Sequence, residues 1–80
     1  MKDFIFESPF PTTEQGLLNL VFLDKSRIFE CFERHSMTRF ALLSEDEKAT
    51  IAKLSILSNG EASLEFHDAV EASVILEKMG

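Results

Sequence analysis

Three tetrapeptides, at residues 12–15, 44–47 and 68–71, place a Thr, Ser or Asp three residues before a Glu or Gln. This spacing is typical of the capping box, in which the first side chain accepts a hydrogen bond from a free backbone N–H at the start of a helix. The Glu or Gln side chain in turn accepts one from the N–H of the cap residue. The chain is therefore predicted to start helices close to residues 13, 45 and 69.

A further helix is predicted over residues 25–35, with Asp24 or Ser26 as its start. Its apolar stripe, at spacings of three and four, consists of Ile28, Cys31, Phe32 and His35. The opposite side is charged. There Glu30 precedes Arg34 by four residues, which is the favourable order for a helical ion pair.

The N-terminal part is divided by two prolines. Residues 3–7 are predicted to form a short strand, which Pro9 and Pro11 end. Residues 13–23 are predicted to form a helix that is apolar nearly all round and therefore central in the fold. A strand over 17–23 stays open as an alternative, because short apolar runs do not separate the two states.

The stretch that starts at Ser44 has two main interpretations. As one helix, it runs to Asn59-Gly60, which supplies a left-handed stop. As a strand, its apolar residues alternate with polar ones, and Asn59-Gly60 becomes the turn of a hairpin. A mixed arrangement, one helical turn at 45–48 followed by a strand, is the third possibility. The state of residues 49–57 stays open.

The hairpin interpretation depends on its register. A two-residue loop would mix polar and apolar faces, whereas a three-residue loop over 58–60, with Gly60 left-handed, gives one apolar face. The pairs are then Ile56 with Ala62, Leu54 with Leu64 and Ala52 with Phe66. On either interpretation residues 62–67 are extended, and a helix over 69–79 follows. That helix is predicted to turn Val70, Val74 and Ile75 inward.

The order of these elements predicts an α+β fold in which helices dominate. Its sheet is a short antiparallel one or a hairpin, and a mainly α fold is the alternative. A chain of 80 residues with 45% hydrophobic residues has the length and composition of one small domain over residues 1–80. Such a domain buries only about 60% of the surface of the unfolded chain.

The formal net charge of −6 is concentrated in the second half of the chain. Residues 1–40 carry five basic and six acidic side chains, whereas residues 41–80 carry three and eight. Because an acidic surface repels phosphate, neither nucleic acid nor an anionic membrane is expected as a partner. A protein with a basic or apolar surface is expected instead. The single cysteine and the lack of a long apolar run predict a cytoplasmic protein.

Cys31, His35 and His67 are the side chains best suited to chemistry. Cys31 and His35, four residues apart, would share a helix face, as a metal-ligand pair or a thiol–imidazole pair requires, and His67 is the candidate third ligand. No paired CxxC or HxxxH accompanies them, and a free cysteine in an apolar stripe packs as a small hydrophobe. The three glycines are too far apart for a phosphate-binding loop. No catalytic residue, metal or cofactor is therefore expected.

All eight aromatic residues are Phe, so the chain lacks the Tyr and Trp anchors common at interfaces. Phe29 projects off the stripe of the helix at 25–35, and Phe10 and Phe40 lie in predicted loops. Two interpretations stay open. Either all eight are core residues, or some form an exposed apolar patch that a partner or a second copy covers. The second interpretation predicts a homo-oligomer.

The expected function is that of a non-enzymatic, acidic protein-interaction module, an adaptor or inhibitor of a larger partner, with mimicry of nucleic acid as one version. The acidic side chains expected to bind the partner are Glu45, Asp46, Glu47, Glu61, Glu65, Asp68 and Glu71. The alternative is a small winged-helix or helix-turn-helix transcriptional regulator. Its basic residues would be Lys25, Arg27, Arg34 and Arg39.

Overall fold

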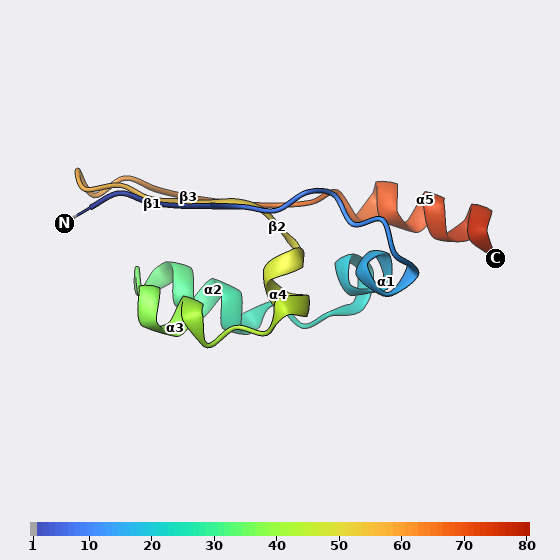
Figure 1. The fold of residues 1–80 in the computed structure, drawn as a ribbon, viewed down its shortest axis with the longest axis horizontal. Helices are drawn as coiled ribbons and strands as arrows, with labels where there is room; N and C mark the ends of the chain where they lie inside the picture. Colours follow the sequence, from blue (N-terminus) through green and yellow to red (C-terminus); the bar gives the residue numbers. More distant parts are fainter. Residues whose placement is uncertain (1) are drawn as a thin grey trace.

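A computed structural model describes residues 2–80, which adopt the predicted α+β fold (Figure 1). The elements in chain order are β1 (Phe4–Glu7), α1 (Glu14–Phe22), α2 (Ser26–Glu33), α3 (Met37–Ala41), α4 (Glu45–Ala49), β2 (Ile51–Ile56), β3 (Ala62–Phe66) and α5 (Ala69–Met79). Within the described chain, no helix has both the length and the apolar character that crossing a membrane demands.

The three strands form an antiparallel sheet in the order β1-β2-β3, so β1 and β3 are its edges. α2, α3 and α4 lie on one side of this sheet and leave the other side open (Figure 1). Directly opposed residues share a face. The register therefore gives the open face, apart from Ile5, a polar set: Glu7, Lys53, Ser55, Ser63 and Glu65.

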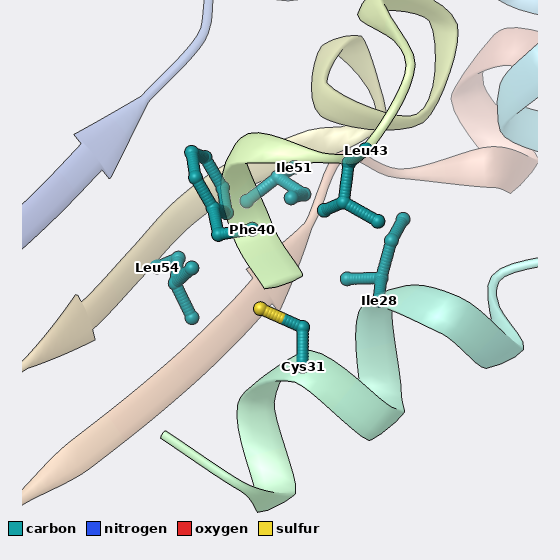
Figure 2. Close-up of a cluster of buried hydrophobic side chains, with 6 residues drawn as sticks. All are labelled: Ile28, Cys31, Phe40, Leu43, Ile51 and Leu54. Atoms are coloured by element: carbon teal, nitrogen blue, oxygen red, sulfur yellow. The ribbon is translucent and has the colours of Figure 1, made fainter. Parts of the chain in front are cut away.

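The main core lies between the covered face of the sheet and α2 and α3. Six buried side chains form it: Ile28, Cys31, Phe40, Leu43, Ile51 and Leu54 (Figure 2). The ring of Phe40 stands edge-on to Phe4 and Phe6, with centroids 5.1 and 5.0 Å apart. The placement of Phe40 in a loop is thus wrong, because residues 37–41 form a short helix that turns this ring toward the sheet.

α2 is confirmed as a helix, but it ends before His35. Asp24 Oδ1 accepts a hydrogen bond from the Ser26 N–H (2.9 Å) at its start, and this bond lowers the pKa of the Asp24 carboxyl. His35 has a left-handed backbone (φ 49°) and is exposed. Its place in the apolar stripe is therefore wrong. Ser36 follows at once and caps α3 by accepting a hydrogen bond from the Arg39 N–H.

A second cluster, of Leu17, Leu20 and Ala72, lies between α1 and α5, beyond the end of the sheet (Figure 1). The molecule is accordingly elongated, 46 × 18 × 15 Å, with a radius of gyration of 13.4 Å against about 11.6 Å for a compact chain of this length. α1 packs on the face of α5 that carries Ala72 and Ile75. Val70, predicted to point inward, is instead 73% exposed, and Val74 is exposed too, because both lie on the opposite side.

Residues 45–66 adopt the mixed arrangement, one short helix (α4) followed by the β2–β3 hairpin, so the single long helix is wrong. The three-residue loop is confirmed. Leu57 N–H donates to Glu61 O (2.7 Å), and Gly60 has a φ of +94°. The pairs 56–62 and 54–64 also hold, but Phe66 faces Ile51 and not Ala52, because a β-bulge intervenes. The bulge places the larger Ile51 side chain in the core.

The three predicted helix starts are confirmed, with one shifted cap. Ser44 makes the complete capping box with Glu47, through hydrogen bonds of 2.9 and 3.1 Å. Asp68 caps α5 by accepting from the backbone N–H groups of Val70 and Glu71. At α1 the cap is Thr13, one residue later than the pattern predicts.

Candidate functional site

An apolar groove of about 550 Å³ lies between α2 and β3. Its lining residues are Phe29, Phe32, Glu33, Ala62, Ser63, Leu64 and Phe66. Phe29 packs edge-on against Phe66, with centroids 5.4 Å apart, yet it is 49% exposed. A large apolar side chain exposed beside such a hollow is typical of binding surfaces. We call this feature the α2–β3 groove.

The backbone of β3 adds polar groups to one side of the α2–β3 groove. β3 pairs with β2 alone within the described chain. Leu57 N–H donates to Glu61 O, and bonded pairs alternate along an antiparallel ladder. Ser63 therefore bonds to β2, whereas Ala62 and Leu64 direct their N–H and C=O groups toward the free edge. The groove thus combines apolar side chains with backbone donors and acceptors that no strand uses.

The surface around the α2–β3 groove is acidic. Glu61 and Glu65 are exposed beside the groove, and Glu33 adds a carboxylate to the lining. One cation close to the lining residue Phe66 is engaged in the fold. The Lys25 ammonium lies 5.9 Å from the centroid of the Phe66 ring and donates to the Leu20 and Leu23 carbonyl oxygens. The groove therefore has an apolar lining with carboxylates at its margin.

The seven predicted partner-binding acidic residues do not form one site. Glu61 and Glu65 are exposed and belong to β3 or its turn, beside the α2–β3 groove. Asp68 and Glu71 lie further on, at the start of α5, where the Asp68 carboxylate caps the helix. Only the first two thus lie beside the groove, and neither belongs to its lining.

The remaining three residues belong to α4, and one of them is structural. Glu47 is only 5% exposed, and its Oε1 accepts from Ser44 N–H and lies 3.3 Å from Arg27 Nη1. A buried carboxylate held on both sides has no surface to offer a partner. Glu45 and Asp46 are exposed and stay candidates for contact.

The candidate metal and nucleophile residues lie in different environments. Cys31 is buried in the core, and its Sγ donates to Ser36 O (3.1 Å), whereas His35 is exposed and His67 packs near β1. Burial raises the pKa of the Cys31 thiol, against a smaller opposing effect of Arg39. Among residues 2–80, no group of three or more His, Cys, Asp or Glu side chains could hold a metal ion.

Cys31 is expected to react with a thiol reagent at least about a hundredfold more slowly in the folded chain than in urea, because the buried, protonated thiol must first be exposed. A raised pKa also means that the folded chain binds more protons than the unfolded chain at alkaline pH. Stability should therefore fall as the pH rises past the ordinary pKa of a thiol. Labelling rates and urea titrations from neutral to alkaline pH measure both effects. Equal labelling rates in the two states would contradict the buried placement.

Ser8 and His67 form a contact that the sequence did not indicate. Ser8 Oγ lies 3.3 Å from His67 Nε2, a distance that suits a nucleophile and its base. Nε2 is also 2.8 Å from the Ser8 carbonyl oxygen, which only accepts, so Nε2 carries the proton. The Ser8 hydroxyl meanwhile donates to Ile51 O. The pair therefore ties the end of β1 to the end of β3, and it has no free base to activate a nucleophile.

Sequence reasoning singled out Phe29 but not the α2–β3 groove as a whole. The one available signal was the position of Phe29 off the helix stripe, because the sequence pattern places the other apolar lining residues at ordinary core positions. Comparisons of the chain with models of known protein families, with curated proteins and with solved structures give no match.

Proposed function

We propose that this chain is a non-enzymatic protein-binding module that docks on a larger partner through the α2–β3 groove. The observation that carries the proposal is the half-exposed Phe29 beside the unpaired edge of β3. Aromatic side chains that become buried when the partner binds usually form the centre of a binding interface. A standard interface takes about 800 Å² per partner, a modest share of the 5274 Å² surface of residues 2–80.

The charges support a protein partner over a nucleic acid. Arg27 lies 3.3 Å from Glu47, and Arg34 and Arg39 lie 3.6 and 2.8 Å from Glu30. These carboxylates offset three of the four cations that a DNA-binding regulator would use. The surplus of acids instead attracts a basic surface. The one free cysteine, Cys31, fits a reducing compartment, and we place the module in the cytoplasm.

Replacing Phe29 with Asp is expected to weaken partner binding at least about tenfold, because a charged group would enter the apolar groove in place of its anchor. The measurement is selection of a random peptide library, displayed on phage, against the immobilised chain. Enriched peptides are then titrated against Phe29→Asp and against Phe22→Asp. Phe22 is the matched control, since it is also a helix residue but is 77% exposed and lies outside the groove lining.

The proposal expects the Phe22→Asp chain to bind like the original. Far-UV circular dichroism of both variants establishes that they stay folded. Two results count against the module: no peptide enriched over an unrelated acidic protein, or enriched peptides that bind the Phe29→Asp chain undiminished.

A further inference from the structure

We propose that the α2–β3 groove binds an extended polypeptide segment, which adds to the free edge of β3 as a fourth, antiparallel strand. The segment carries apolar side chains at alternate positions and Lys or Arg between them. This inference rests on the proposed function and specifies its ligand. It follows from the backbone of β3, the side chains of the groove and the charges on the open face of the sheet.

The backbone of β3 provides the hydrogen bonds. Ala62 and Leu64 direct their N–H and C=O groups outward, and the alternation extends to Phe66 beyond the bulge, since the N–H of His67 donates to Thr50 O on the other side. Residues of an added strand that lie opposite these three would each exchange two hydrogen bonds with β3. An amphipathic helix in the groove would leave the same groups without partners.

The same three positions fix the faces of the added strand. Ala62, Leu64 and Phe66 line the α2–β3 groove, and opposed residues of a sheet share a face. Every second side chain of the segment would therefore enter the groove, toward Phe29 and Phe32 of α2. Burial of apolar side chains at these positions would stabilise the complex.

The intervening side chains would lie on the open face of the sheet, beside Glu61, Ser63 and Glu65. Two carboxylates four residues apart on this face attract cations at the matching positions of the added strand. On this face Lys53 stands opposite both Glu7 and Glu65, so two carboxylates share its charge, and residues 54–77 add no further Lys or Arg. From the position opposite Phe66 to that opposite Glu61, the side chains of the segment are therefore expected to be apolar, basic, apolar, of any kind, apolar and basic.

The two edges of the sheet differ in how they are protected. β1 has four residues, and Pro9 and Pro11 follow it closely, which are common devices against strand pairing. β3 has five residues, and no Pro follows it before α5. A second copy of this chain is disfavoured as the added strand, because it brings a net charge of −6 toward the same acids.

The test uses the peptide acetyl-Val-Lys-Val-Thr-Val-Lys-amide and the isotope-labelled chain, with binding followed by NMR titration. N-methylation of the central Val removes a donor that faces Leu64 and should weaken binding at least about tenfold. N-methylation of Thr is the matched control, because the N–H of the residue opposite Ser63 points away from β3, and it should change binding by less than about twofold. Replacing both Lys residues with Glu should also weaken binding at least about tenfold.

The outcomes separate this inference from the proposed function. Strand addition is overturned if the two methyl groups weaken binding equally, if the Glu peptide binds as well as the Lys peptide, or if the β3 amide resonances do not move. The proposed function survives such a result when library peptides still depend on Phe29. Sedimentation tests whether a second copy occupies the edge. Dimers that depend on concentration, that the peptide does not disturb and that the Phe29→Asp chain does not form would assign the edge to a second copy. That result would overturn the proposal of a basic partner.

Discussion

Replacing Phe40 with Ala is expected to lower the free energy of unfolding by about 3–5 kcal/mol. The ring is only 8% exposed and stands edge-on to both Phe4 and Phe6, and the Lys48 ammonium lies 5.4 Å from its centroid. Truncation would leave a cavity between α3 and β1 and remove both aromatic pairs. Because an 80-residue chain has a total stability of about 4–12 kcal/mol, the variant should be close to unfolded.

The measurement is urea denaturation followed by far-UV circular dichroism, since the chain has no Trp or Tyr for fluorescence. A stabilising osmolyte in both samples keeps the variant measurable. Phe22→Ala is the matched control, and its exposed position predicts a change within about 0.5 kcal/mol. A loss below 1 kcal/mol for Phe40→Ala would show that α3 does not pack on the sheet as described.

Replacing Glu47 with Ala is expected to destabilise the chain by about 2–3 kcal/mol. The change leaves the Ser44 N–H without its acceptor and removes the buried half of the capping box. The contact with Arg27 adds little, because that guanidinium is largely exposed and screened by solvent. Glu47→Gln keeps an acceptor for Ser44 and should lose about 1 kcal/mol.

Glu45→Ala is the control for Glu47→Ala, since the Glu45 side chain is 94% exposed and approaches Lys48 only to 3.9 Å. A change within about 0.5 kcal/mol is expected there. If the two alanine variants lowered the free energy of unfolding equally, the capping box would not be what stabilises α4. The comparison also separates a structural role from a binding role. If a Glu47 variant lost partner binding, the cause would be unfolding of the chain and not the loss of a contact with the partner.

The parts of the fold that depend on neighbouring residues were predictable. Helix caps at Ser44 and Asp68 are set by side chains within three positions of the backbone groups that they satisfy. The three-residue turn at Gly60 follows from one left-handed residue and the need for a single apolar face. These features require no knowledge of distant contacts.

The parts that failed depend on contacts between distant segments. α5 has apolar residues on two opposite sides, and only the packing of α1 decides that Ala72 is buried and Val70 is not. The β-bulge is likewise chosen by the gain from burying Ile51 under the helices. The short α3 has few residues for a periodic pattern, and Phe40 orders it through contacts with a strand far away in sequence.

The candidate site was predicted only in part. The general acidity of the second half and the separate position of Phe29 are properties of the sequence, whereas the α2–β3 groove requires two segments to meet. Glu47 shows the limit most clearly. Its charge suggests a partner surface, but the Ser44 backbone and Arg27 turn it into an internal residue.

The polar open face of the sheet bears on whether the exposed edge of β3 could lead to fibril formation. Fibrils of the cross-β type need strands added along the hydrogen-bonding direction and also a dry, interlocking contact between stacked sheets. The hydroxyl pair Ser55–Ser63 and the charges of Glu7, Lys53 and Glu65 occupy the surface where such stacking would occur. The proposed addition of one strand at the edge would therefore leave a face on which a second sheet stacks poorly, with Ile5 as its one large apolar side chain among the described strand residues.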